Sequence, residues 1–153
     1  INGFSINHNN IESPQNCFLN QVLETKKGNA VSISIFYTIL ARLLEIPAHF
    51  VDFPRNPLVG IIDHKLAKKV HGKSTKSDVL FYINTSNKGA IASRKEIDYH
   101  LKKNNYKNAA KFTEPKSDII FIKRLVESMR DAYRSVGFTE KEARVKELLK
   151  LFR

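Results

Sequence analysis

Hydrophobic and polar positions along the chain predict a helical start, a block of strands and a helical end. Ser13-Pro14 has the pattern of a helix N-cap followed by proline in the first turn. Apolar residues at 18, 19, 22 and 23 share one face of the helix that follows, and Lys26-Lys27-Gly28 ends it. Residues 30–46 are apolar on almost every side, which predicts a buried central helix that Pro47 ends.

Short strands follow the central helix. The segments with strand patterning are 48–53, 58–62, 79–83 and 90–91, of which 79–83 carries the strongest signal. Residues 64–76 lie between the second and third strands. Their mixture of lysine, histidine, glycine, serine and threonine predicts an exposed loop. The Asn-rich residues 1–12 are expected to be irregular.

Capped helices are predicted toward the C-terminus. Ser93 and Glu96 form a capping-box pattern, and so do Thr139 and Glu142. The first pair begins a helix that ends near residue 103, and the second pair begins the last helix. A further helix over about 118–136 precedes that last helix. Because only a short turn separates the two, they predict an antiparallel hairpin.

The order of the elements predicts an α+β fold. A small antiparallel sheet packs against the buried central helix, and a helical hairpin follows. A single hairpin cannot bury its own apolar face, so we expect residues 117–153 to pack on a core formed by residues 1–116. Both parts then make one structural domain, for which 153 residues and 42% hydrophobic content suffice.

Composition excludes several classes of protein. No run of eighteen apolar residues is present, so no membrane helix is predicted. The single cysteine excludes an internal disulfide and a cysteine-rich zinc site. The chain has no phosphate-binding glycine loop, no nucleophile elbow and no paired metal-binding motif. We therefore expect a cytoplasmic protein without metal or cofactor.

The net charge of +11 is concentrated in one part of the chain. Residues 65–116 hold thirteen of the 26 basic residues and four acidic ones. The densest cluster consists of Lys65, Lys68, Lys69, Lys73 and Lys76. Two interpretations stay open: a solvated loop, or a surface for nucleic acid or an acidic partner. No aromatic residue occurs between 65 and 78, which argues against base stacking at this cluster.

Several motifs in the same order resemble one known family. They are Cys17-Phe18-Leu19-Asn20, Lys26-Lys27-Gly28-Asn29, Glu45-Ile46-Pro47-Ala48, Phe81-Tyr82-Ile83-Asn84 and Lys88-Gly89-Ala90-Ile91. Together with the C-terminal helical pair, they are similar to the SirB-type branch of the transglutaminase-like superfamily. The resemblance implies a papain-like core, a further helical segment before residue 1, and a Cys-His-Asp triad in catalytic members.

The triad positions of the family hold other residues in this chain. The resemblance places Ala30 at the cysteine position, at the start of the central helix. It places Asn56 at the histidine position and Asn84 at the aspartate position. Alanine offers no nucleophile, and asparagine cannot act as a general base near neutral pH. The resemblance thus implies a non-catalytic domain that binds a protein or small ligand, whose identity the sequence leaves open.

One alternative keeps an enzymatic role. Cys17 is the only thiol and lies on the predicted first helix beside Phe18 and Leu19, where a buried structural residue is the competing interpretation. A reactive Cys17 would indicate a cysteine-dependent hydrolase or transferase. His64 and His71 are close enough in sequence to chelate a metal, but lysines surround them and Asp63 is the sole other ligand nearby.

Overall fold

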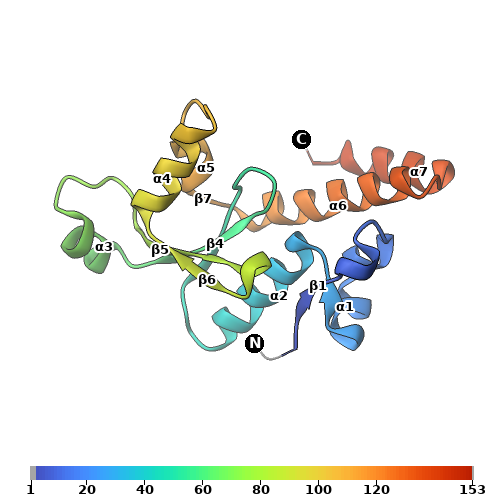
Figure 1. Ribbon diagram of the computed structural model, residues 1–153, viewed down its shortest axis with the longest axis horizontal. Coiled ribbons are helices and arrows are strands. Elements are labelled where there is room, and N and C mark those ends of the chain that lie inside the picture. The colour runs from blue at the N-terminus through green and yellow to red at the C-terminus, as the bar shows by residue number, and fades with distance from the viewer. Residues whose placement is uncertain (1–2, 153) are drawn as a thin grey trace.

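A five-stranded antiparallel sheet forms the centre of the computed structural model, which describes residues 3–152 (Figure 1). In spatial order the strands are β6 (Ala90–Ala92), β5 (Val79–Asn84), β4 (Leu58–Ile62), β3 (Ala48–Val51) and β7 (Pro115–Lys116). Helix α2 (Ala30–Leu43) packs on one face, while α4 (Arg94–Lys103) and α5 (Ala110–Thr113) cover the other. The predicted α+β fold is confirmed.

The alternating direction of side chains along the strands explains why helices pack on both faces of the sheet. Val59 and Ile83 face α2, whereas their neighbours Leu58 and Tyr82 face α4. Because successive side chains of a strand point to opposite faces, one sheet supports two apolar clusters. All four of these residues belong to segments whose apolar pattern is visible in the sequence.

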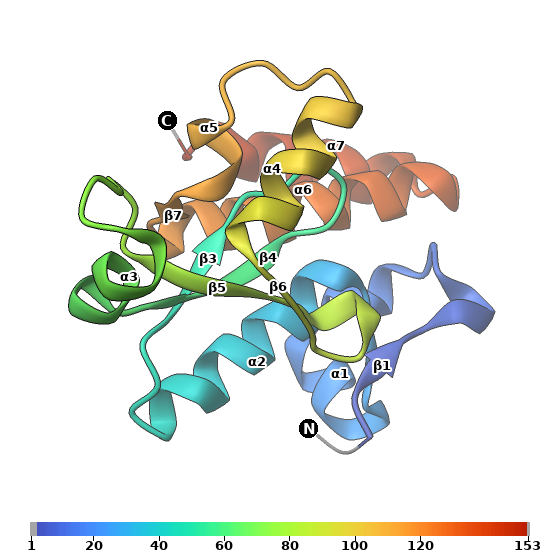
Figure 2. The same cartoon turned by 60° about the vertical axis from the view of Figure 1, so that its left-hand side comes forward.

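The central helix begins as its sequence indicates and ends more exposed than predicted. The Asn29 side chain accepts from the Ser32 backbone N–H, and the Ser32 hydroxyl accepts from the Asn29 N–H, which makes a capping box. The prediction of burial on every side is wrong for the last turn. Leu43 is 74% exposed and Leu44 is 73% exposed, because this end of α2 projects beyond the sheet (Figure 2).

The C-terminal hairpin shares the core of the domain. Helix α6 (Asp118–Ser135) lies on α2 and β3, where the rings of Phe121 and Phe50 stack with centroids 4.1 Å apart. Helix α7 (Thr139–Leu149) packs back on α6, with Val145 buried against Val126. The predicted hairpin is confirmed.

The predicted capping box at the start of α7 is wrong. Phe138 occupies the N-cap position, so Thr139 is already the first helical residue. The Glu142 carboxylate instead pairs with Arg134 at 2.9 Å and Lys146 at 2.7 Å. The Lys146 pair has i,i+4 spacing within α7, whereas the Arg134 pair depends on the packing of α7 against α6.

The first predicted helix is broken into two. A 3-10 turn, η2 (Pro14–Cys17), is followed by α1 (Leu19–Thr25), and Phe18 between them is extended. The break lets Cys17 pack in the cluster beneath α2 while Phe18 packs on the helical hairpin. The expected N-cap is present, because the Ser13 hydroxyl accepts from the Gln15 N–H.

Two segments expected to be irregular are ordered. Strand β1 (Ser5–Ile6), followed by the 3-10 turn η1 (His8–Asn10), pairs parallel with β2 (Lys27–Gly28). Strand β7 pairs with β3 at the sheet edge. Both strands are two residues long, too short for a hydrophobic period to show in the sequence.

The lysine-rich segment begins with a helix and is a loop only in its second part. Helix α3 (His64–His71) is capped by the Asp63 carboxylate, which accepts from the Leu66 N–H, and Ala67 is fully buried. The prediction of a loop over 64–76 is therefore wrong for its first eight residues. The expected turn after β5 is present as η3 (Thr85–Asn87), and the Ser93–Glu96 capping box of α4 is confirmed.

Within residues 3–152, no helix has both the length and the apolar content needed to cross a membrane.

Candidate functional site

A cavity of about 340 Å³ opens at the start of α2. We call it the α2 N-terminal pocket. Polar or small side chains from five separate segments line it, among them His8, Ala30, Arg55, Asn56, Ser86 and Ser128. The cavity size lies within the range of small-ligand sites in proteins.

Ala30 and Asn56 face the same pocket. Ala30 is the first residue of α2, directly after the Asn29 cap. Peptide dipoles make the N-terminal end of a helix partly positive, so a thiol at this position would be shifted toward its thiolate. Ala30 carries only a methyl group, and the local field therefore acts on no ionisable side chain at this position.

The loop that carries Asn56 is held by α6. Arg124 on that helix donates to the Arg55 carbonyl at 3.1 Å and pairs with the Asp52 carboxylate at 3.1 Å. Arg55 itself adopts a left-handed backbone conformation, with φ 67°. Within the described part of the chain its guanidinium has no carboxylate within ion-pair distance, so it adds an uncompensated positive charge to the pocket.

Asn84 shapes the neighbouring turn instead of lining the pocket. Its side-chain oxygen accepts from the N–H groups of Ser86 at 3.1 Å and Asn87 at 3.2 Å, which caps η3. Ser86, two residues later, does line the pocket. Its hydroxyl oxygen is shielded from solvent and has no hydrogen-bond partner among residues 3–152. Two of the three triad positions therefore share the cavity, and the third positions a residue that does.

A chain of hydroxyl groups fastens η3 to α2. The Ser34 hydroxyl donates to the Ala30 carbonyl at 2.7 Å. Since that hydroxyl has one proton, Thr85 is the donor in the Thr85–Ser34 hydrogen bond, whose oxygens are 2.7 Å apart. Both residues are buried. This link holds the turn bearing Ser86 against the helix bearing Ala30.

Cys17 lies outside this pocket. Its side chain is 2% exposed, and the Asn29 side-chain amide donates to its sulfur at 3.1 Å. Burial raises the pKa of the Cys17 thiol to about 11, although the Asn29 hydrogen bond lowers it in part. The thiol is therefore neutral and shielded near neutral pH, whereas a nucleophilic cysteine needs a low pKa and an open approach.

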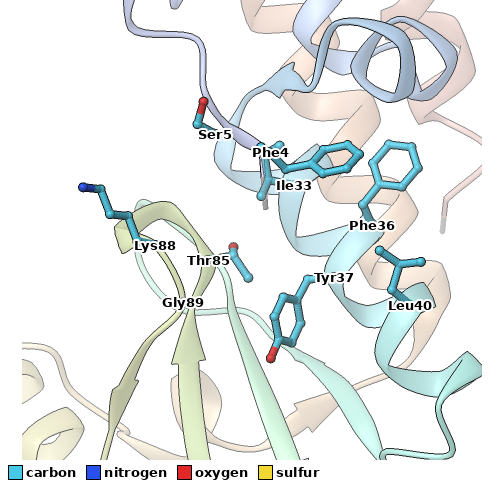
Figure 3. Close-up of a pocket in the computed structure, with 10 residues that line it drawn as sticks. Phe4, Ser5, Ile33, Phe36, Tyr37, Leu40, Thr85, Lys88 and Gly89 are labelled. Carbon is cyan, nitrogen blue, oxygen red and sulfur yellow. The ribbon is translucent and has the colours of Figure 1, made fainter. Parts of the chain in front are cut away.

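A second cavity of about 420 Å³, with aromatic side chains in its lining, lies beside the first. Figure 3 shows Phe4, Phe36, Tyr37 and Leu40 around it, with Thr85 on the opposite side and the Lys88 side chain pointing away. The Phe4 and Phe36 ring centroids are 5.6 Å apart. Neighbours in sequence line the two cavities: Ser5 and Thr85 belong to this one, Ile6 and Ser86 to the α2 N-terminal pocket.

The five lysines of the predicted basic surface are all exposed. Lys65, Lys68 and Lys69 stand on α3, and Lys73 and Lys76 on the loop after it.

The two histidines of α3 each hydrogen bond a different partner. His64 hydrogen bonds the Asp78 carboxylate, and His71 Nε2 lies 2.9 Å from the Leu80 carbonyl oxygen. Over residues 3–152, no three histidine, cysteine or acidic side chains gather as a ligand set.

Several residues of the site were not predicted from the sequence, among them Asn29, Arg55 and Ser86. Asn29 was visible as a potential N-cap before an apolar helix, but its contact with Cys17 required the fold. Arg55 and Ser86 carry no sequence signal, because each reaches the pocket from a loop whose path is set by other segments.

The chain is similar to known proteins over most of its length. A sequence profile described as the transglutaminase-like superfamily matches residues 2–127. Two proteins named UPF0162, from Xylella fastidiosa strains Temecula1 and 9a5c, are each 42% identical to it over 57 residues. That matched part is 37% of this chain and 20% of each relative. No solved structure matches the chain.

Proposed function

Because the chain belongs to the transglutaminase-like superfamily, we propose that it is a non-catalytic, SirB-type member that binds a peptide or small polar ligand in the α2 N-terminal pocket. The observation that carries this proposal is Ala30. This methyl group stands at the helix start, beside the pocket, where the superfamily's chemistry requires a thiol.

The remaining chemistry of the pocket suits binding. Asn56 is exposed and supplies both a donor and an acceptor. Peptide groups and carboxamides present the same pairing of N–H and C=O, so a neutral amide ligand can satisfy both groups of this side chain. Arg55 adds a positive charge, which favours a ligand that also bears a carboxylate.

The competing cysteine-hydrolase function finds no support in the surroundings of Cys17. Its thiol is buried, its pKa is raised to about 11, and its hydrogen-bonding neighbour is an amide rather than a base. A nucleophile needs an adjacent base or a lowered pKa to act near neutral pH.

Catalysis is tested by turnover. We expect no release of ammonia or amine from glutamine-containing peptides above the level seen with Cys17→Ala. Turnover that Cys17→Ala abolishes would overturn the non-catalytic assignment.

Binding is tested by NMR on the ¹⁵N-labelled protein. The probe is an N-acetylated, C-amidated tripeptide with a central glutamine. We expect saturable shifts at the backbone amides of Ala30 and Ser86 and at the Asn56 side-chain amide. Asn56→Ala should weaken the binding, whereas Asn20→Ala, an exposed amide on α1, should not. Shifts located elsewhere, or none, would contradict the assignment of this pocket.

A further inference from the structure

The positive charge of residues 65–116 is not neutralised inside the domain. Each of the four acids in this segment is already engaged: Asp78 with His64, Glu96 with the Ser93 N–H, and Asp98 and Glu114 both with Arg94. Among residues 3–152, none of the twelve lysines of this segment lies within ion-pair distance of a carboxylate. The excess charge therefore faces solvent and is free to attract an anionic partner.

Helix α4 adds an exposed aromatic ring to this charge. Tyr99 is 68% exposed. Lys95, Lys102 and Lys103 stand at i−4, i+3 and i+4 from it, and all three are exposed. These spacings place the three lysines and Tyr99 on one helix face. We call this the Tyr99 face.

Loose packing does not account for the exposure of Tyr99. The opposite face of α4 buries Ile97 and Leu101 against the sheet, at 6% and 1% exposure. A helix fixed in this way presents Tyr99 to solvent as a rigid platform.

One carboxylate also lies near the ring, and it is turned away. Glu96 stands at i−3 from Tyr99, but its carboxylate accepts from the Ser93 backbone N–H at 2.6 Å and so caps the helix. That hydrogen bond holds the pKa of Glu96 below its usual range. The Glu96 carboxylate is therefore committed to the start of the helix and forms no ion pair with the lysines of the face among residues 3–152.

We propose that the Tyr99 face binds single-stranded nucleic acid. Lys95, Lys102 and Lys103 pair with successive phosphates, and Tyr99 stacks on an unpaired base. Stacking is what favours a single strand over a duplex, whose bases are already stacked on each other. The lysines of α3 lack an exposed tyrosine, phenylalanine or tryptophan beside them, and they contribute long-range attraction rather than stacking.

Helices α3 and α4 both lie at the end of the molecule away from α1 (Figure 1, Figure 2). The α2 N-terminal pocket is built from other elements, so this proposal and the proposed function can fail separately.

The test is fluorescence anisotropy with labelled oligo(dT) and oligo(U) of about 16 nucleotides, in about 50 mM salt. We expect saturable binding that weakens steeply with salt. Tyr99→Leu should weaken it about tenfold, whereas Tyr99→Phe keeps the ring and should bind like the wild type. Lys102→Gln with Lys103→Gln should lower the slope of log K against log salt by about 1.4.

The matched control replaces two lysines at another place in the fold. Lys146→Gln with Lys150→Gln removes the same charge from α7 and its C-cap, where both lysines are in ion pairs, and should leave the slope unchanged. Three outcomes overturn the proposal: no binding at low salt, a Tyr99→Leu variant that binds as the wild type does, or equal or tighter binding to duplex, polyglutamate or anionic vesicles. The last outcome assigns the face to that other partner.

Discussion

Thr85 donates a buried hydrogen bond to Ser34 across 51 positions of sequence, with the two oxygens 2.7 Å apart. The Ser34 hydroxyl in turn donates a hydrogen bond to the Ala30 carbonyl, so the two hydrogen bonds join the turn after β5 to the first turn of α2. These are the two elements that carry Ser86 and Ala30 into the α2 N-terminal pocket. This pair of hydroxyl groups thus helps to fix Ser86 relative to Ala30 in the pocket.

We expect Thr85→Val to lower the free energy of unfolding by about 1–2 kcal/mol, because it removes the buried donor while keeping the shape of the side chain. Urea unfolding measures the change. Ser86→Ala is the matched control in the same turn. The Ser86 hydroxyl has no partner among residues 3–152, so its removal should leave stability nearly unchanged. Equal losses of unfolding free energy in the two variants would show that the Thr85–Ser34 hydrogen bond adds nothing specific to the stability of the fold.

We expect Cys17 to react slowly with iodoacetamide in the folded protein. With its pKa at about 11, the thiolate fraction near pH 8 is about a hundredfold below that of an exposed thiol, and burial reduces access further. Mass spectrometry follows the reaction, and denaturant should accelerate it. Rapid labelling of the folded chain would contradict the buried, neutral thiol.

A cysteine placed at the helix start should behave differently. In a Cys17→Ala background, we expect Ala30→Cys to react at least about tenfold faster than Cys17 does in the wild type. The reason is that Ala30 lines an open pocket at the positive end of α2. Labelling as slow as that of Cys17 would show that the pocket does not expose this position.

We expect Gly28→Ala to lower the free energy of unfolding by at least about 2 kcal/mol. A Cβ at Gly28 would lie 2.5 Å from the Ser32 hydroxyl and 3.1 Å from Val22. The Ser32 side chain cannot move away without an energetic cost, because its hydroxyl belongs to the capping box of α2. Thermal unfolding measures the loss. Adding Ser32→Ala removes the closest contact but also the cap, so the double variant should lose less than the sum of the two single variants.

The Arg42–Asp118 ion pair should make stability depend on pH. Arg42 bonds both carboxylate oxygens of Asp118, at 2.7 and 3.0 Å, and this holds the pKa of Asp118 below its usual range. A carboxylate with a lowered folded-state pKa stabilises the fold above its unfolded pKa of about 3.9, and the contribution is lost as pH falls. Both side chains are more than a third exposed, so solvent screening limits the contribution to about 1 kcal/mol or less.

Asp118→Asn should therefore be less stable than the wild type at pH 7, and the difference should shrink below about pH 4. Urea unfolding at the two pH values tests this. A difference that stays constant over this range would mean that the substitution acts through packing or the helix start and not through charge.

Local patterns explain which elements were predictable. The capping box at Ser93, the strand over 79–83 and the stop before Pro47 each depend on residues within one turn or a few positions. The predictions failed where contacts outside the predicted pattern decided the structure. At the start of α7, the Glu142 carboxylate forms ion pairs with Arg134 and Lys146 instead of capping the helix. In the first predicted helix, Cys17 and Phe18 pack in two different apolar clusters, and the helix is broken at Phe18.

The candidate site shows the same division. Ala30, Asn56 and Asn84 could be named from the motifs that surround them in sequence. Their positions relative to one another could not, because each stands on a different element. The structure brings Ala30 and Asn56 to one pocket and turns the Asn84 side chain into its own tight turn.

The sequence by itself determined the α+β order of elements, the family resemblance, and the missing thiol at the start of α2. These follow from hydrophobic period, capping residues and side-chain identity, which are local properties of a chain. Only the tertiary structure decided that Cys17 is buried beside Asn29, that Ser86 and Arg55 reach the pocket, and that Tyr99 is exposed on the same helix face as three exposed lysines. Burial, pKa and charge pairing depend on which distant segments pack together, and no pattern within one segment specifies that.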